Sequence, residues 1–348
     1  MEKRQPHIRV LLGARAGDNA QALELARQLG GPVTPAPLSF NVLSGLPNWL
    51  RGAGFKTLTG GRAAALAAPW PDIVIATGRR TAPVNLAIKA ESGGRSLAIQ
   101  LGRPRMPLAR FDLVLTTAQY GLPQDDNVVM LDFPFAVARQ VPEATLARFR
   151  ERWSHLPRPW IVGVIGAAKF PIGFGSAEIE GFAHAVDALA RRHNGSVILM
   201  DSPRSVPGAI AAVAHRISVP RWHWTRGDGD NPYQAALRLA DRLAVTSDSV
   251  SMVAEMVQSG TPTAVYHLPS SPLVPSWSAS TGLAGHLARS GLVSPPRSVT
   301  AYLSRLTAKG WIGDLNTGSE PVQAFVLDGQ HEAAVQRILT LWRSRAAG

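Results

Sequence analysis

The sequence predicts an α/β protein with two Rossmann-like domains. A strand, a glycine-bearing turn and a helix follow one another at residues 8–29, and the same order returns at residues 160–192. A complete strand–helix–strand unit, typical of a parallel sheet, occupies residues 242–266. The chain has 348 residues and is 45% hydrophobic, which is enough to build two cores. We therefore expect one domain at residues 1–156, a second at residues 157–325 and a C-terminal helical segment at residues 326–348.

The composition excludes several kinds of site. No cysteine is present, so the chain has no disulfide, no thiolate metal site and no cysteine nucleophile. The first residues lack an apolar signal and no uncharged apolar run approaches a bilayer span, so we expect a cytoplasmic protein. Residues 1–110 hold 15 Lys and Arg against 5 Asp and Glu, which is +10 of the total charge of +12. We expect this region to meet an anion other than nucleic acid, because Lys-rich tracts and a recognition helix are missing.

The first strand–turn–helix unit places Asp18 at the start of a helix. Residues 8–12 are predicted to form a buried strand, and residues 18–29 an amphipathic helix. The glycine turn between them has the geometry of a phosphate or substrate loop, although it lacks the G-x-G-x-x-G spacing. Asp18 either caps the helix or faces the site as the general base for an acceptor hydroxyl. Gly17 and Asn19, on either side, are predicted to contact the acceptor.

Residues 42–58 interleave apolar and basic side chains. Glycine and proline make this segment a poor long helix. An apolar segment with tryptophan and positive charge suits a membrane interface or a lipid-linked acceptor. The alternative is a connection that packs in the core. The predicted membrane residues are Trp49, Leu50, Arg51, Phe55 and Lys56.

Two consecutive predicted strands deliver arginines at their carboxyl ends. Residues 72–77 and 97–101 have the apolar character of parallel strands, and a helix is expected at residues 82–91. Ligands bind at this edge of an open parallel sheet, so the arginines should converge on one crevice that suits phosphate or carboxylate. A solvated rim is the alternative. The arginines are Arg79, Arg80, Arg103 and Arg105, and strands at residues 111–116 and 128–131 complete the sheet.

The second domain is predicted to repeat this pattern after a charged helix at residues 143–153. Ser202 and Arg204 follow a strand at residues 196–200, and both have the chemistry to hold a diphosphate. Asn231 has the character of a helix cap before Pro232. The other expected elements are a strand at residues 160–165, a helix at 176–192, a strand at 222–224 and helices at 281–290, 298–307 and 330–344.

The unit at residues 242–266 predicts a second anion site. Residues 243–246 and 263–267 are short buried strands, and polar N-cap side chains stand where helical spacing begins. The first N–H groups of this helix point at the carboxyl end of the sheet, where they can hold a phosphate. Glu255 lies about one and a half turns further on, where a carboxylate can accept both hydroxyls of a ribose. A plain capped helix with a solvated Glu255 is the alternative. The N-cap residues are Ser247, Asp248 and Ser249, and the N–H groups are those of Ser249, Val250 and Ser251.

The same stretches resemble the motifs of a known family. Thr246-x-Asp-Ser-Val-Ser-Met-x-x-Glu255, followed by Gly260-x-Pro262, is similar to the signature of the elongated-mitochondria (mitochondrial fission) family. Bacterial members of this family resemble GT-B glycosyltransferases. Five further motifs follow in the order of the family, at residues 13–21, 76–80, 100–105, 110–114 and 229–233.

The resemblance implies a GT-B-like architecture, in which two Rossmann-like domains face each other across a cleft. The first domain then holds the acceptor, the second holds the donor, and the C-terminal helix packs back toward the first domain. The family has two adjacent arginines and a threonine near residues 202–205 and a paired glycine at residues 166–167, and this chain departs from both patterns. The implied donor contacts are Ser202, Arg204, Asn231, Ser249, Val250, Ser251, Met252 and Glu255.

The function that the sequence favours is a glycosyltransferase that moves a sugar from a nucleotide-diphosphate donor to a lipid-linked or envelope-glycan acceptor, peripheral on the inner face of a membrane. We expect no metal and no cofactor besides the donor, because no Asp-x-Asp pair stands at a predicted strand end. One alternative is a sugar-nucleotide epimerase or hydrolase on the same scaffold. Another is a non-enzymatic adaptor, as the role of plant relatives in mitochondrial fission implies. An adaptor has no need of Glu255, the capped helix and the arginines together, so their joint presence favours an enzyme.

Overall fold

The computed structural model describes residues 4–60, 66–135, 140–166, 174–202, 205–269, 282–294, 296–326 and 329–347. The chain divides into two compact units. Unit 1 is Met1–Val137, Ser276–Ser298 and Asp328–Gly348, and unit 2 is Ala138–Pro275 and Val299–Leu327. The expected boundary after residue 156 therefore falls inside unit 2, and a segment late in the chain returns to unit 1. None of the described helices combines the length and the apolar character needed to cross a bilayer.

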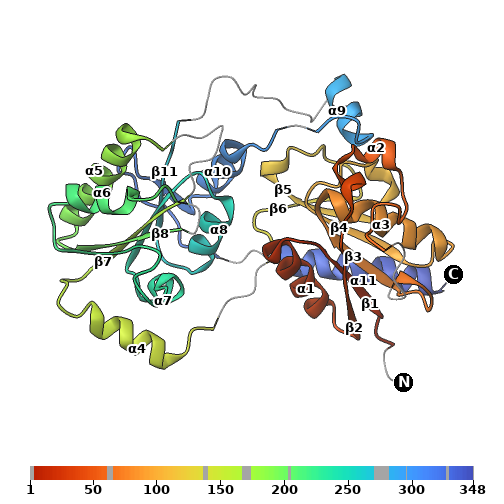
Figure 1. Cartoon of the computed structure of the whole chain (residues 1–348), viewed down its shortest axis with the longest axis horizontal. Coiled ribbons are helices and arrows are strands. Elements are labelled where there is room, and N and C mark those ends of the chain that lie inside the picture. The colour runs from red at the N-terminus through yellow and green to blue at the C-terminus, as the bar shows by residue number, and fades with distance from the viewer. Residues whose placement is uncertain are drawn as a thin grey trace. The chain divides into compact units, whose positions relative to one another are not determined.

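Unit 1 is a parallel sheet of six strands in the order β2-β1-β3-β4-β5-β6. Every neighbouring pair is parallel, so each connection crosses over the sheet and the strand ends of one kind share one edge. Figure 1 shows the helices that cover the two faces. The strands are β1 (Ile8–Leu12), β2 (Val33–Pro37), β3 (Ile73–Thr77), β4 (Leu97–Leu101), β5 (Leu113–Thr117) and β6 (Val128–Leu131), and the helices are α1 (Ala16–Leu29), α2 (Asn48–Arg51), α3 (Gly78–Glu91), α9 (Gly282–Arg289) and α11 (Gln330–Ala347).

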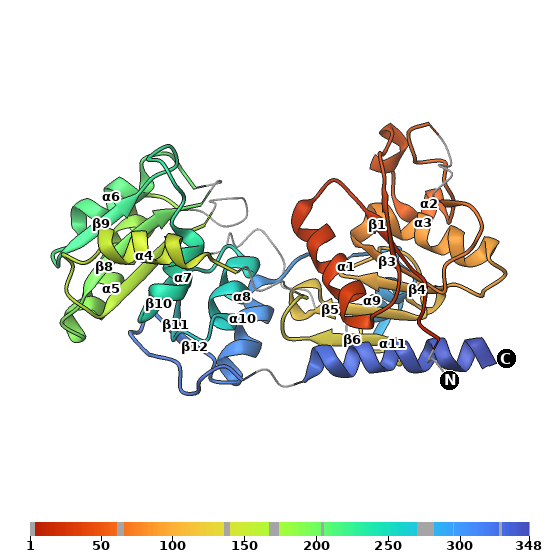
Figure 2. The same ribbon diagram turned by 90° about the horizontal axis from the view of Figure 1, so that it is seen from below.

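The C-terminal helix α11 completes the core of unit 1. Its residues Val335, Ile338 and Trp342 pack in one apolar cluster with α1 and the central strands. Figure 2 shows this helix lying along unit 1. Its first turn is also held by polar contacts, because the Gln330 side chain donates to a carboxylate oxygen of Asp132 at 2.6 Å. The last helix of the chain is thus part of the first sheet's core.

Unit 2 is a second parallel sheet of six strands, in the order β12-β11-β10-β7-β8-β9. Its main core lies between the sheet and the pair α5 and α6, and Figure 1 shows α7 and α8 on the other face. The strands are β7 (Trp160–Ile165), β8 (Ser196–Asp201), β9 (Arg221–Trp224), β10 (Arg242–Thr246), β11 (Thr263–Tyr266) and β12 (Ile312–Asp314), and the helices are α4 (Glu143–Arg152), α5 (Ser176–Arg192), α6 (Ala209–Arg216), α7 (Tyr233–Leu239), α8 (Val250–Gln258) and α10 (Val299–Ala308).

The structure differs from the sequence prediction at the edges of both sheets. The strands β2 and β12 were not predicted, and both lie at a sheet edge. Pro35 and Pro37 in β2 suppress the usual strand signal, but an edge strand tolerates residues without an N–H group. Helix α3 starts at Gly78, directly after β3, and not at residue 82. Residues 78–80 are therefore the first turn of a helix and not a loop.

Candidate functional site

A basic hollow of about 420 Å³ lies at the carboxyl ends of β1, β3, β4 and β5 in unit 1. Six of its lining residues are arginines, and Asp18 is the one carboxylate among the described residues that line it. We call it the arginine hollow. Its arginines are Arg15, Arg79, Arg80, Arg103, Arg105 and Arg297. The structure thus brings together all four arginines predicted to converge at this edge.

Asp18 lies in the first turn of α1 and does not cap it. The N-cap residue is Arg15, and no side chain caps this end. The capping interpretation of Asp18 is therefore wrong, because the helix starts two residues earlier than predicted. The carboxylate faces the start of α3, where a Cβ placed on Gly78 would lie 3.9 Å from Asp18 Oδ2.

The two residues beside Asp18 have different positions. The Asn19 side chain accepts from the Gly13 N–H and donates to the Gly13 carbonyl, both at 2.8 Å, and so closes the turn after β1. Asn19 lines the hollow, but its amide is used by the turn. Gly17 is exposed on α1 and is not among the lining residues.

The arginines are held by two different elements. Arg79 and Arg80 occupy the first turn of α3, where the helix dipole adds to their positive charge. Arg79 Nη1 donates to the carbonyl oxygens of Gly45 at 3.5 Å and Leu46 at 3.3 Å, so it also holds the segment before α2. Arg105, after β4, has a φ of 54°, in the left-handed region that side chains other than glycine rarely occupy.

Positive charge accumulates in this hollow beyond what its acidic group can balance. Burial, together with the charges of Arg105 and Arg297, lowers the pKa of Arg103 from its ordinary value to about 10. Burial and the neighbouring arginines Arg105 and Arg80 also lower the pKa of Arg79. A cation with a lowered pKa gains free energy when an anion arrives. The hollow is therefore suited to a phosphate or carboxylate group.

Arg51 extends this cationic cluster toward α2. Its Nη2 donates to the Asn48 side-chain oxygen, while Nε and Nη1 are buried without a hydrogen-bond partner among the described residues. Burial, and then the charges of Arg79 and Arg80, lower its pKa. The structure thus places this residue, predicted to face a membrane, partly inside the protein and beside the arginine hollow.

The other predicted membrane residues divide into two groups. Trp49 and Leu50 are exposed by 56% and 57%, and Lys56 is also exposed. Phe55 is half-buried and packs against an apolar cluster with Leu58. The core interpretation is therefore correct for Phe55 and wrong for Trp49 and Leu50.

Sequence reasoning missed three residues of the hollow. Arg15 lies in the predicted turn before α1, and no site role was predicted for it. The Tyr120 hydroxyl accepts from Arg297 at 3.2 Å, and the guanidinium of Arg297 lies 4.9 Å from the centre of the Tyr120 ring. Arg297 comes from the segment that returns to unit 1 late in the chain, where the Ser298 N–H donates to the Gln119 carbonyl at 2.9 Å. No local sequence signal indicates this long-range placement.

In unit 2 the start of α8 lies at the carboxyl edge of the sheet, as predicted. Ser249 is the N-cap residue, but no side chain caps the helix. The predicted capping is wrong because the neighbouring side chains have other partners. Ser247 Oγ accepts from the Leu268 N–H at 2.9 Å, and Thr246 Oγ1 donates to Asp248 Oδ1 at 2.6 Å. The N–H groups at the start of α8 are therefore not covered by a capping side chain.

The neighbouring strand ends meet at the same edge of unit 2. The Gly166 N–H after β7 donates to Thr246 Oγ1 at 2.8 Å, and a Cβ on Gly166 would overlap the Asp248 carboxylate. After β8 the Ser205 hydroxyl donates to the Gly166 carbonyl at 3.0 Å, and the Ser202 N–H donates to Ser205 at 2.7 Å. Ser202 thus lies near the start of α8. Arg204 and the loop from residue 167 to 173 lie outside the described residues.

The remaining donor candidates lie just before α7 and on α8. Asn231 is exposed and its side-chain oxygen accepts from the Tyr233 N–H at 2.9 Å, so it supports the start of α7. Pro232 is the N-cap residue of this helix. Ser251 and Glu255 are exposed and Met252 is half-buried, while Val250 is buried.

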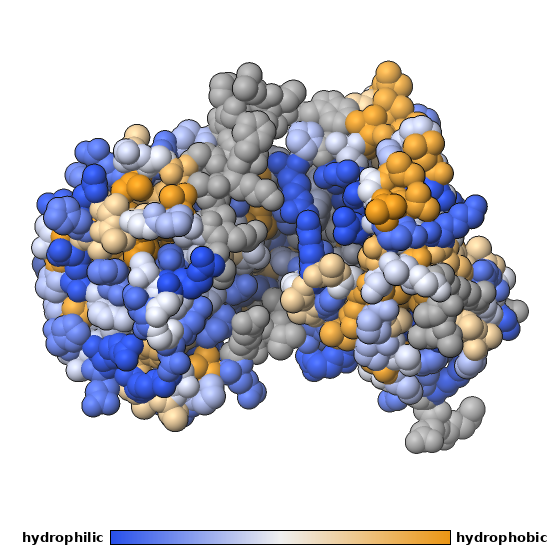
Figure 3. Space-filling view, viewed as in Figure 1, coloured by the Kyte–Doolittle hydropathy of each residue, from blue (hydrophilic) through white to orange (hydrophobic). Residues whose placement is uncertain are grey.

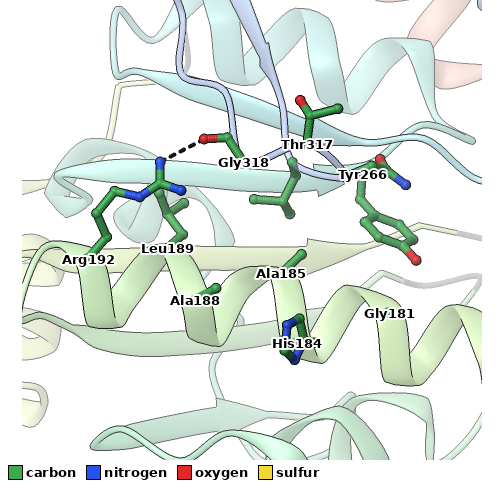
Figure 4. A pocket seen from close by; sticks show the side chains of 11 residues that line it. Gly181, His184, Ala185, Ala188, Leu189, Arg192, Tyr266, Thr317 and Gly318 are labelled. Atoms are coloured by element: carbon green, nitrogen blue, oxygen red, sulfur yellow. Dashed lines mark hydrogen bonds between the residues drawn. The ribbon is translucent and has the colours of Figure 1, made fainter.

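A second hollow, of about 380 Å³, contains none of the predicted site residues. Figure 4 shows that it lies between α5 and the segment after β12, with Gly181, His184 and Tyr266 at one end. At the other end Arg192 donates to the Gly318 carbonyl at 2.7 Å. Burial and the charge of Glu178 raise the pKa of Tyr266.

Comparison with known proteins identifies the family. A family model described as mitochondrial fission ELM1 matches residues 16–309. The chain belongs to this family. It is 27% identical over 221 residues to the mitochondrial fission protein ELM1 of Arabidopsis thaliana, which covers 55% of this chain and 50% of the plant protein. The chain thus spans about half the length of the curated relative it matches.

Solved structures share the fold of this family member. A putative UDP-N-acetylglucosamine 2-epimerase from Listeria monocytogenes has a TM-score of 0.52 at 10% identity, with 98% of each chain covered. MurG from Acinetobacter baumannii has a TM-score of 0.46 at 12% identity, with 97% of this chain and 91% of that chain covered. Together with the two parallel sheets, this confirms the predicted fold class of two Rossmann-like, GT-B-like domains. At this identity the likeness shows the fold alone.

Proposed function

We propose that this family member is a glycosyltransferase that moves a sugar from a nucleotide-diphosphate donor to an anionic acceptor. One observation carries the proposal: Asp18 lines the same hollow as six arginines. Arginines hold a phosphate or carboxylate of the acceptor, and a carboxylate beside them takes the proton of an acceptor hydroxyl. A site that only bound an anion would gain nothing from Asp18, because its charge opposes the ligand.

The donor is proposed to bind at the start of α8 in unit 2. The N–H groups of Val250, Ser251 and Met252 and the hydroxyls of Ser249 and Ser251 are suited to the diphosphate. Glu255, exposed on the same helix, is suited to the ribose hydroxyls. We propose Ser202, Arg204 and Asn231 as further donor contacts. The leaving diphosphate is then stabilised by the helix dipole and Arg204.

The proposal in its finer form names a lipid-linked or envelope-glycan acceptor and a peripheral position at a membrane. The cationic hollow and the exposed Trp49 and Leu50 support it. The similarity to a plant mitochondrial fission protein supports a second candidate, a non-enzymatic adaptor in mitochondrial fission. An adaptor binds no sugar nucleotide, so donor binding separates the two functions. A sugar-nucleotide epimerase or hydrolase is the other enzyme of this fold, and it needs no acceptor.

The test is a thermal-shift and calorimetric panel of UDP, GDP, CDP and dTDP sugars on the full chain, with and without magnesium. One nucleotide should raise the melting temperature specifically, because it binds the folded state. Glu255→Ala should weaken its affinity about tenfold through lost ribose contacts. Glu180→Ala, which removes another exposed carboxylate from α5, is the matched control and should change nothing. If no nucleotide stabilises the folded chain, the adaptor is the better explanation.

A further inference from the structure

Exposed apolar side chains are concentrated around the arginine hollow. Of the thirteen exposed large apolar side chains of the described chain, five lie within residues 42–50 and three within residues 283–293. Val42 is 92% exposed and Leu283 is 75% exposed. Figure 3 shows the apolar surface over α2 and α9, beside strongly hydrophilic surface of the same unit. We call these two segments the apolar face.

Both segments are attached to the loop that carries Arg105. The Asn48 side chain, next to Trp49, donates to the Pro104 carbonyl at 2.7 Å. On the other side, the chain after α9 is packed so closely that a Cβ on Gly291 would lie 2.6 Å from the Met106 backbone. The apolar face is therefore built onto the carboxyl edge of the sheet, beside the arginine hollow. Figure 1 shows α2 and α9 at the same end of unit 1.

The cations and the apolar face are physically linked. Arg79, which lines the hollow, donates to the carbonyl oxygens of Gly45 and Leu46 inside the apolar segment. Arg51, directly after Leu50, holds two buried guanidinium nitrogens without a partner among the described residues. Apolar side chains beside arginines match the layer of a bilayer where acyl chains meet phosphates, and tryptophan favours this layer.

We propose that unit 1 docks on an anionic lipid bilayer through the apolar face, and that the arginine hollow takes the phosphate of a lipid headgroup. This deepens the proposed function, because it names the acceptor side as a lipid phosphate. A phosphomonoester fits better than a phosphodiester, since it offers more charge and three terminal oxygens to bidentate arginines. Anionic lipid also attracts the basic first third of the chain over a longer range.

Vesicle sedimentation of the full chain tests the docking. The vesicles are phosphatidylcholine with about a quarter of phosphatidic acid, or the same fraction of phosphatidylglycerol. Phosphatidic acid should bind several-fold better than phosphatidylglycerol, because only the monoester enters the hollow fully. Equal binding to the two lipids would overturn the headgroup site, and no gain over phosphatidylcholine alone would overturn the docking.

Matched variants test the apolar face. Trp49→Ser should reduce vesicle binding about tenfold and Val42→Ser about threefold, because each removes apolar area from the bilayer. Val322→Ser is the control, since Val322 is 86% exposed in unit 2. Equal losses in all three variants, or none in the first two, would overturn the proposal.

A soluble phosphate separates anion binding in the arginine hollow from docking of the apolar face on the bilayer. Inorganic diphosphate should stabilise Trp49→Ser as well as the parent chain and Arg80→Gln less than both, because Arg80→Gln removes a cation of the hollow and leaves the start of α8 unchanged. If Trp49→Ser loses diphosphate binding together with vesicle binding, the substitution has damaged the hollow and the apolar face is not an independent docking element. Failure of donor binding to unit 2 would refute the transferase and would leave the vesicle result standing, so the two proposals fail separately.

Discussion

Replacing Arg103 with glutamine should stabilise the free protein near neutral pH. The pKa of Arg103 is lowered to about 10, mainly by burial and then by the charges of Arg105 and Arg297. A pKa shift of one unit corresponds to about 1.4 kcal/mol. The folded protein therefore disfavours the charged form of Arg103 by at most about 3 kcal/mol. Arg103 is half-buried, so solvent screening reduces the penalty to about 1–2 kcal/mol. The substitution also removes the contact between the Arg103 guanidinium and the Tyr120 ring, whose centre is 5.8 Å away. This loss reduces the expected stabilisation by about 0.5 kcal/mol.

The pH dependence has a definite sign. The folded-state pKa lies below the unfolded value, so the folded chain holds an unfavourable charge at every pH below about 10. The penalty fades as the pH rises above about 10, where the folded chain releases this proton before the unfolded chain does. The gain in the free energy of unfolding should therefore be about 1 kcal/mol and constant around neutral pH, and should shrink above pH 10.

Urea unfolding in buffer without phosphate measures this gain. Inorganic diphosphate should stabilise the parent chain more than Arg103→Gln, because the anion relieves the charge that the variant lacks. Arg110→Gln removes an exposed arginine of the same unit and should stay within about 0.5 kcal/mol of the parent chain. If Arg103→Gln is less stable than the parent chain, or if diphosphate stabilises both equally, the reasoning about the hollow is refuted.

Three further substitutions test separate parts of the site. Asp18→Asn should leave donor binding unchanged but lower turnover about 10²- to 10⁴-fold, and unchanged turnover would exclude Asp18 as the base. Arg105→Gly and Arg105→Ala both remove the charge, but only glycine relieves the backbone at a φ of 54°. The free energy of unfolding of the glycine variant should therefore be about 1 kcal/mol higher than that of the alanine variant. If urea unfolding shows the alanine variant to be the more stable, the backbone at residue 105 is not strained. Gly166→Ala should cost about 1–3 kcal/mol, because the new Cβ overlaps the Asp248 carboxylate, which Thr246 holds in place. A urea midpoint equal to that of the parent chain would show that Asp248 moves freely.

Local signals were enough to predict most of the architecture. The unit β10–α8–β11 was predicted to within a residue at the strand ends, because a short apolar run, a polar helix start and Gly260 at a φ of 81° are all local features. The convergence of Arg79, Arg80, Arg103 and Arg105 was also predictable, since carboxyl ends of neighbouring parallel strands share one edge.

The parts that failed depend on long-range packing. The absence of a side-chain cap on α8 could not be predicted, because it depends on hydrogen bonds with other residues. Ser247 accepts from the Leu268 N–H, and Asp248 accepts from the Thr246 hydroxyl. Arg297 reaches the hollow only because a late segment of the chain folds onto the first sheet. The exposure of Trp49 depends on where α2 rests, which its own four residues do not specify.

The three separate stretches of unit 1 set an order of assembly on the ribosome. A nascent chain that has reached residue 137 contains all six strands of the first sheet, yet it lacks Arg297 and the helix that carries Ile338 and Trp342. The apolar surface that α11 covers in the folded protein therefore lacks this helix until all of unit 2 has been synthesised. Unit 2 has only one such interruption and its central strands are complete by residue 266. The first unit to be started is thus the last to be finished, and neither unit can be transplanted into another member of the family at a single junction.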